Sequence, residues 1–124
     1  RTVDVWATDE NFWVRRTALL SFHDALLAGN GDFDHFERIA TPMLVEREFF
    51  IRKAIGWVLR STTRRAPELV IGFVERHARE MSTLTFHEAT RRLPLREQRR
   101  LRTLREDGEL SRKPARKPKA RRSS

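Results

Sequence analysis

Apolar residues recur every three or four positions along most of the chain, which is the spacing of one face of an α-helix. The clearest case is the stretch over residues 46–65. On a helical wheel with about 100° per residue, its aliphatic side carries Ile51, Ile55, Val58, Leu59 and Thr62. The opposite side carries Lys53, Trp57, Arg60 and Arg64 within an arc of about 60°. We call these four residues the basic stripe.

The basic stripe departs from an ordinary surface helix, whose polar face mixes both charge signs. It contains no carboxylate, so its cations are not paired along their own face. Cations around an exposed aromatic ring fit a polyanion with flat groups, which is a nucleic acid. Trp57 also fits core packing between helices, but its three flanking cations favour contact with a ligand.

The same periodicity predicts further helices on both sides of this stretch. They are expected over residues 11–28, 33–40, 67–80 and 85–93. Gly29 is expected to end the first, Pro42 to end or kink the second, and Pro67 to open the third. Alternation with period two, the signal of a strand, is absent. The sequence therefore predicts an all-α fold built from pairs of helices.

Short polar residues mark the expected helix starts, because their side chains can accept hydrogen bonds from the free N–H groups of a first turn. Thr8 or Asp9 is expected to cap the first helix, and Asp32 the second. Thr85 and Glu88 have the T-x-x-E spacing of a capping box, which predicts that the last short helix begins at Thr85.

Two of the predicted helices repeat one another. The segment NFWVRRTALLSF from Asn11 aligns with EFFIRKAIGWVL from Glu48, at an offset of 37 residues. A weaker third copy places Ala89 under Ala54, at an offset of 35 residues. A helix-pair repeat of this length predicts a HEAT-like α-solenoid. The first-copy positions that match Lys53, Trp57 and Arg60 are Arg16, Leu20 and His23. Neighbouring units are therefore expected to line one continuous basic groove.

The net charge of +9 is unevenly distributed. Residues 91–124 hold 14 Lys+Arg against 4 Asp+Glu, whereas residues 1–90 hold 12 against 13. The body is near neutral, so only its local stripes argue for an anionic partner. We divide the chain into a helical domain over residues 1–93 and a basic tail over residues 94–124. Residues 111–124 contain no large apolar side chain, which predicts disorder after about residue 108.

The amino-acid composition excludes several classes of protein and of binding site. The chain has no cysteine, which excludes disulfides and cysteine-based zinc sites and fits the reducing cytoplasm. No apolar run is long enough to span a bilayer. The 4 histidines show no ligand spacing, so no metal site is expected. We therefore expect a cytoplasmic protein with no membrane or metal partner.

Two strings carry a resemblance to a known family, namely WATDENFWVRRTALL over residues 6–20 and FFIRKAIGWVLR over residues 49–60. Both are similar to the DNA alkylation repair family, the AlkD-type DNA glycosylases, and the likeness extends over residues 6–93. The resemblance implies a HEAT-like solenoid that holds duplex DNA in a concave basic cleft. It also implies removal of N3- and N7-alkylated purines without a metal or other cofactor.

The resemblance further implies roles for individual residues. The tryptophan of the family's G-W pair falls on Trp57, which would lie against the damaged nucleotide, and its backbone-binding arginines fall on Arg16 and Arg60. Lys53 and Arg64 of the basic stripe are expected to bind DNA beside them. The family's catalytic Asp lies in an upstream, tryptophan-rich segment that nothing here matches. We therefore expect a C-terminal fragment with no identifiable catalytic residue, belonging to a protein that is monomeric at full length.

Departures from the family pattern and simpler interpretations leave two function classes open. Ser61 stands where the family commonly has an acidic residue, which predicts looser support of Arg60, and His87 replaces a common arginine. Arg16 and Arg60 also fit solvated surface charges, and Trp13 fits packing better than contact. The first class is a DNA glycosylase. The alternative is a non-catalytic HEAT-like module that binds nucleic acid or protein.

Overall fold

The computed structural model describes the backbone of residues 2–111 and the side chains of residues 2–107. The elements are α1 (Thr2–Trp6), α2 (Phe12–Leu20), α3 (His23–Leu27), α4 (Phe33–Ala40), the 3₁₀ helix η1 (Thr41–Val45), α5 (Phe49–Thr63), α6 (Pro67–His77), α7 (Thr83–Thr90) and α8 (Leu95–Ser111). The described part of the chain has no strand, so the predicted all-α fold is confirmed. No helix in this part is both long and apolar enough to cross a membrane.

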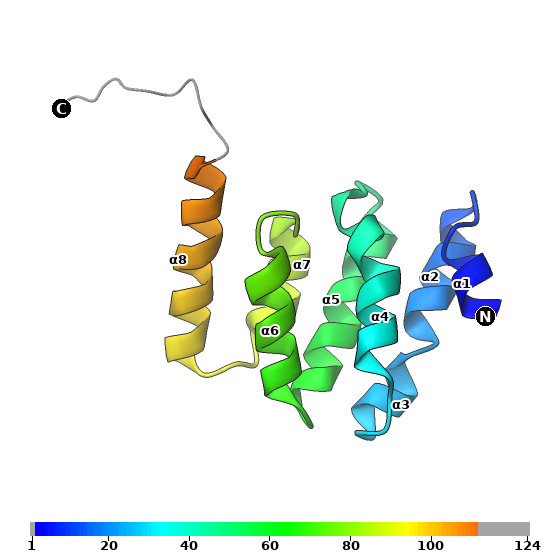
Figure 1. Ribbon diagram of the computed structural model, residues 1–124, viewed down its shortest axis with the longest axis horizontal. Helices are drawn as coiled ribbons and strands as arrows, with labels where there is room; N and C mark the ends of the chain where they lie inside the picture. The colour runs from blue at the N-terminus through cyan, green and yellow to red at the C-terminus, as the bar shows by residue number, and fades with distance from the viewer. Residues whose placement is uncertain (1, 112–124) are drawn as a thin grey trace.

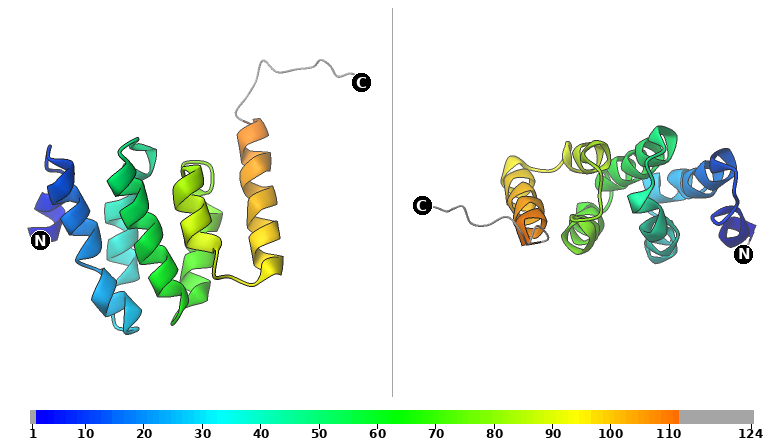
Figure 2. Two further views of the ribbon diagram at one scale, coloured as in Figure 1. Left: turned by 180° about the vertical axis from the view of Figure 1, so that it is seen from behind. Right: turned by 90° about the horizontal axis from the view of Figure 1, so that it is seen from above.

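The helices stack as successive pairs along the length of the molecule (Figure 1). Figure 2 shows α1, α4 and α6 in one layer and α2 with α3, α5 and α7 in the other. α8 stands at the C-terminal end of the stack and contacts α6. The arrangement is solenoid-like, as predicted, and α5 lies in the middle of its layer between α2 with α3 and α7.

The aliphatic side of α5 forms the centre of the core. The side chains predicted to lie inside are almost or completely buried, namely Ile51, Ile55, Val58, Leu59 and Thr62. Burying one aliphatic side chain of this size contributes about 1.5–3 kcal/mol, so the set fixes the rotation of α5 about its axis. The opposite side, which carries the basic stripe, is thereby turned toward solvent.

The predicted first helix is wrong in its length and its cap. The chain forms α2 and α3 with a break at Ser21 and Phe22, where Ser21 Oγ donates to the Ala18 carbonyl at 2.7 Å. Such bonding from serine to the preceding turn bends a helix, and the bend directs Phe22 into the core. The N-cap of α2 is Asn11 rather than Thr8 or Asp9, because Asn11 Oδ1 accepts from the Trp13 N–H at 2.8 Å.

The boundaries of the next helices agree with the sequence. Asp32 caps α4 by accepting a hydrogen bond from the His35 N–H at 3.0 Å. α4 ends at Ala40, and the 3₁₀ helix η1 follows with Pro42 in its first turn. Pro67 opens α6, where its missing N–H costs nothing. These helix boundaries depend on residues adjacent in sequence, which is why they could be predicted.

The predicted capping box at the start of α7 is wrong. The helix begins at Thr83, two residues earlier than predicted, and its N-cap is Ser82, whose Oγ accepts from the Thr85 N–H at 3.0 Å. Thr85 lies inside the helix and donates its hydroxyl to the Arg52 carbonyl of α5 at 3.0 Å. Glu88 is thereby free of any capping role and is turned toward α5. At the other end of the chain, α8 continues past Gly108 to Ser111, and the rest of the predicted disordered tail lies outside the described residues.

Candidate nucleic-acid interface

The basic stripe lies on the side of α5 opposite its buried aliphatic residues. The left view of Figure 2 shows the layer of α2 with α3, α5 and α7 to which this helix belongs. Trp57 is 39% exposed, so it lies at the surface of the protein and not in its core. Lys53 and Arg64 are exposed, and Arg60 is half-buried. One helix thus presents three cations and an accessible indole to one side of the molecule.

A histidine from α3 supports Trp57. The His23 and Trp57 ring centroids are 4.6 Å apart at an interplanar angle of 39°. His23 is held in turn by a 2.9 Å hydrogen bond between its Nε2 and Ser61 Oγ, and its Nδ1 lies 3.1 Å from Asp24 Oδ1. Ser61, which stands where the family commonly has an acidic residue, therefore has a structural role, since it orients the His23 ring on which Trp57 packs. The repeat had matched His23 with Arg60, but gave no sign of its contact with Trp57.

A carboxylate on α7 completes the surface, and sequence reasoning missed it. Glu88 Oε2 lies 3.3 Å from Lys53 Nζ and 3.6 Å from an Arg91 nitrogen, and Glu88 Oε1 lies 3.2 Å from an Arg60 nitrogen. The cations are unpaired along α5, as predicted, but Lys53 and Arg60 are paired across the helix interface. Arg60 is therefore supported by Glu88, despite the serine at position 61.

Burial of Glu88 alone would raise its pKa, but the hydrogen bond from Lys53 and the charges of Lys53, Arg60 and Arg91 lower the pKa below the ordinary value of 4.5. The carboxylate is consequently ionised at neutral pH. Two signals for this residue exist in the sequence. Glu88 occupies the Lys53 position in the third copy of the repeat, and Gly56 interrupts an otherwise well-filled helix beside it.

Arg16 lies on α2, beside a cluster of aromatic rings that joins α2 to α5. Its guanidinium carbon is 5.7 Å from the Trp13 ring centroid, a cation–π distance. The Trp13 ring in turn lies 4.8 Å from that of Phe50 on α5. Trp13 packs as predicted, yet it stays 47% exposed. Its neighbour Arg15 is committed elsewhere, through hydrogen bonds of 3.0 and 2.7 Å to Glu46.

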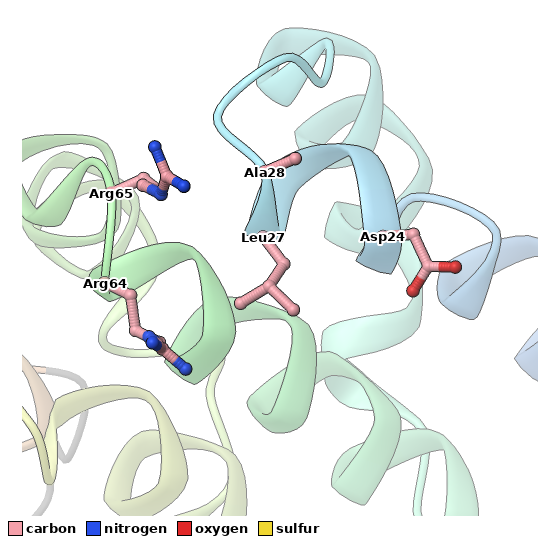
Figure 3. A pocket seen from close by; sticks show the side chains of 5 residues that line it. All are labelled: Asp24, Leu27, Ala28, Arg64 and Arg65. Atoms are coloured by element: carbon pink, nitrogen blue, oxygen red, sulfur yellow. The ribbon is translucent and has the colours of Figure 1, made fainter.

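The C-terminal end of the basic stripe borders a shallow hollow of about 390 Å³ between α3 and the end of α5 (Figure 3). Its lining consists of Asp24, Leu27, Ala28, Arg64 and Arg65. The aliphatic stem of Arg65 packs against the turn at Gly29, whose φ of +85° suits glycine. Arg64 therefore extends the cationic surface beyond the turn that carries Trp57.

The arrangement suits binding of phosphates together with a flat or sugar-like group, since guanidinium and ammonium groups surround an accessible indole. Within residues 2–107, no cluster of three His, Asp or Glu side chains could hold a metal ion. Fold and surface together define an all-α, solenoid-like protein with a basic, tryptophan-bearing face.

The comparison with protein families agrees with this class. Residues 1–93 match the family described as DNA alkylation repair enzyme. The chain belongs to this family, which gives it a role in DNA repair with DNA as its substrate. The predicted resemblance is thus confirmed at the level of the family. No curated protein and no solved structure was found to match the chain.

Proposed function

We propose that this chain is the DNA-binding part of a DNA glycosylase that holds duplex DNA against the basic stripe and excises cationic N3- and N7-alkylated purines. The observation that carries the proposal is the position of Trp57, accessible to solvent and flanked one turn away on each side by Lys53 and Arg60. Membership of the DNA alkylation repair enzyme family supports DNA as the substrate.

The chemistry requires little acid catalysis. An N3- or N7-alkylated purine already carries positive charge, so the bond from its nitrogen to the sugar carbon breaks with the electron pair leaving on the base. Water then adds to that carbon and loses a proton. The step that needs help is the positive charge that develops on the sugar, which an aromatic face and a carboxylate can stabilise.

Trp57 supplies the aromatic face in this proposal. Its indole lies against the deoxyribose of the damaged nucleotide, so the lesion remains in the base stack, unlike in enzymes that flip the base into a pocket. The phosphate backbone is bound by four cations that set the register of the duplex, namely Arg16, Lys53, Arg60 and Arg64. We assign no catalytic carboxylate within the described residues.

Two assays test the proposal. The chain is titrated against duplexes with and without a single N7-methylguanine, and release of the free base is measured with the chain and with the product of its full coding sequence. We expect the chain to bind both duplexes and the full product to release the base. Binding without release in both proteins would favour the non-catalytic module. Absence of DNA binding by the chain would refute the proposal.

A further inference from the structure

A single buried carboxylate, that of Glu88, lies beneath the basic stripe. Its side chain is 7% exposed, whereas those of Lys53, Arg60 and Arg91 are 51%, 26% and 46% exposed. Each of the three cations therefore approaches the carboxylate from one side and remains in contact with solvent on the other. The carboxylate is covered and the cations that pair with it are accessible, which is the arrangement expected of an anion that holds cations in place at a surface.

The contacts to Glu88 leave most of the donors of these cations unused. Lys53 donates one hydrogen bond to Oε2 at 3.3 Å. Arg60 lies 3.2 Å from Oε1, but this contact lacks hydrogen-bond geometry, and Oε1 is buried without a hydrogen bond. A lysine has three N–H donors and an arginine five. Charge attraction thus holds both side chains in place while their donors stay available for another anion.

The position of Glu88 depends on Gly56. A β-carbon at position 56 would lie 2.6 Å from Glu88 Cβ, so any other residue would push α7 away from α5. Glycine inside a helix costs roughly 1 kcal/mol relative to alanine, and burying a carboxylate is unfavourable unless it is well paired. The glycine within α5 and the buried carboxylate on α7 are both locally unfavourable, and they occur at the same contact. Together they place the carboxylate directly under the turn that carries Trp57.

Along α5, Gly56 lies between Lys53 and Arg60, which are seven residues apart and hence separated by roughly 10 Å along the axis. Trp57 projects between them. A carboxylate under Gly56 can therefore draw one cation from each side, one turn before Trp57 and one turn after it. The two charges are placed where they can meet phosphates on either side of a nucleotide that contacts the indole.

We infer that Glu88 is a positioning residue for DNA binding, which holds Lys53 and Arg60 at the height of Trp57 so that both bind the backbone around the lesion. The inference rests on the proposed function. It predicts the direction in which DNA affinity changes when the negative charge of Glu88 is removed. Removing a negative charge from a DNA-binding face should strengthen binding if charge alone matters, whereas loss of a positioning residue weakens it.

The test compares two glutamate-to-glutamine variants that change net charge equally. Glu88→Gln removes the anion under the basic stripe. Glu37→Gln is the matched control, because Glu37 also pairs with two basic side chains, Arg76 and His77, but lies in the layer of α4 and α6. Duplex binding is measured by fluorescence anisotropy over a series of salt concentrations, and melting curves show which variants are folded.

We expect Glu88→Gln to weaken binding about tenfold and to make the dependence of log K on log salt shallower by about one to two, because the Lys53 and Arg60 phosphate contacts are lost. Glu37→Gln should bind at least as tightly as the unchanged chain. Unchanged or tighter binding by Glu88→Gln would overturn the inference.

A double-mutant comparison separates positioning from a general structural role. In a Lys53→Ala/Arg60→Ala background, Glu88→Gln should have no further effect on DNA binding, because the cations it positions are gone. An equal loss of binding in both backgrounds would show that Glu88 only holds α7 against α5, and would refute the inference.

A second variant keeps the test decisive if Glu88→Gln fails to fold. Glu88→Asp retains the charge but shortens the side chain by one methylene, so it no longer reaches both cations, and it should also weaken binding. Wild-type affinity for Glu88→Asp would then contradict the inference. Absence of DNA binding by the unchanged chain would instead refute the proposed function, and the inference with it.

Discussion

Two of the glutamates that join neighbouring helix pairs, Glu37 and Glu88, do so in different ways. Glu37 on α4 accepts hydrogen bonds of 2.8 and 2.7 Å from Arg76 of α6, and its Oε2 lies 2.6 Å from His77 Nε2. Glu88 on α7 is more deeply buried, yet its contacts are 3.2–3.6 Å long and include one hydrogen bond, from Lys53.

The difference shows how one kind of ion pair can serve two purposes. At Glu37 the forked geometry saturates the carboxylate and occupies Arg76, which stabilises the contact between the helices. At Glu88 the carboxylate is neutralised by charge, and the cations keep free donors on the accessible side. The first arrangement strengthens the fold, and we propose that the second prepares a surface for phosphate.

Substitution of one glycine at each junction, Gly56 beside Glu88 and Gly72 beside Arg76, should distinguish the two junctions most strongly. Gly56→Ala places a methyl group 2.6 Å from Glu88 Cβ, and we expect it to lower the free energy of unfolding by about 2 kcal/mol. Gly72→Ala on α6 meets the flexible end of Arg76 at 3.1 Å. There the better helix propensity of alanine should raise stability by about 0.5–1 kcal/mol. Denaturant unfolding of both variants measures the contrast, and equal destabilisation would show that the α5–α7 contact is not unusually close.

Trp57 and Arg60 share the basic stripe, and their substitutions should nevertheless have different effects on the proposed excision reaction. Arg60→Ala should weaken binding to damaged and undamaged duplexes alike, because a phosphate contact is blind to the base. Trp57→Ala should slow single-turnover excision by about tenfold or more while affecting binding less. A fully buried tryptophan would instead cost about 3–5 kcal/mol of stability on truncation to alanine. A large drop in melting temperature with excision intact would remove Trp57 from the site.

Acid should destabilise both junctions. The pKa of Glu37 is lowered, first by its hydrogen bond from Arg76, and that of Glu88 is lowered by Lys53, Arg60 and Arg91 against the effect of burial. A lowered pKa in the folded state contributes stability that is present above the unfolded value, near 4.5, and is lost as the pH falls through the folded value. Glu37→Gln and Glu88→Gln should each flatten the acid side of the profile of unfolding free energy against pH. A profile unaltered by either substitution would contradict the pairing described here.

The faces of α5 could be predicted because they depend on local periodicity. The residues from Ile51 to Thr62 that form the aliphatic side are all buried, and the four residues of the basic stripe lie opposite them. The cap at Asp32 and the start of α6 at Pro67 could be predicted for the same reason. Each depends on residues that are adjacent in sequence.

The sequence-based predictions that are wrong concern features that depend on packing between helices. The T-x-x-E spacing predicts a cap at Thr85, whereas in the structure both Thr85 and Glu88 form hydrogen bonds to α5. The break before α3 goes with the hydrogen bond from Ser21 to Ala18 and with the burial of Phe22, and the helical periodicity of the sequence does not report it. Glu88 meets Lys53 and Arg60 across 35 and 28 residues of sequence, and only the repeat alignment and Gly56 indicate these contacts.

The most direct test of the basic stripe as the DNA-binding surface is an NMR titration of the isotope-labelled chain with a short duplex. It follows the indole N–H of Trp57, the Nε–H of Arg60 and, as an internal control, the Nε–H of Arg76 on the other layer. We predict that the Trp57 and Arg60 signals shift as DNA is added, while that of Arg76 remains in place. Shifts at Arg76 without shifts at Trp57 and Arg60 would mean that DNA binds the opposite layer, and would contradict the assignment of the basic stripe as the DNA-binding surface.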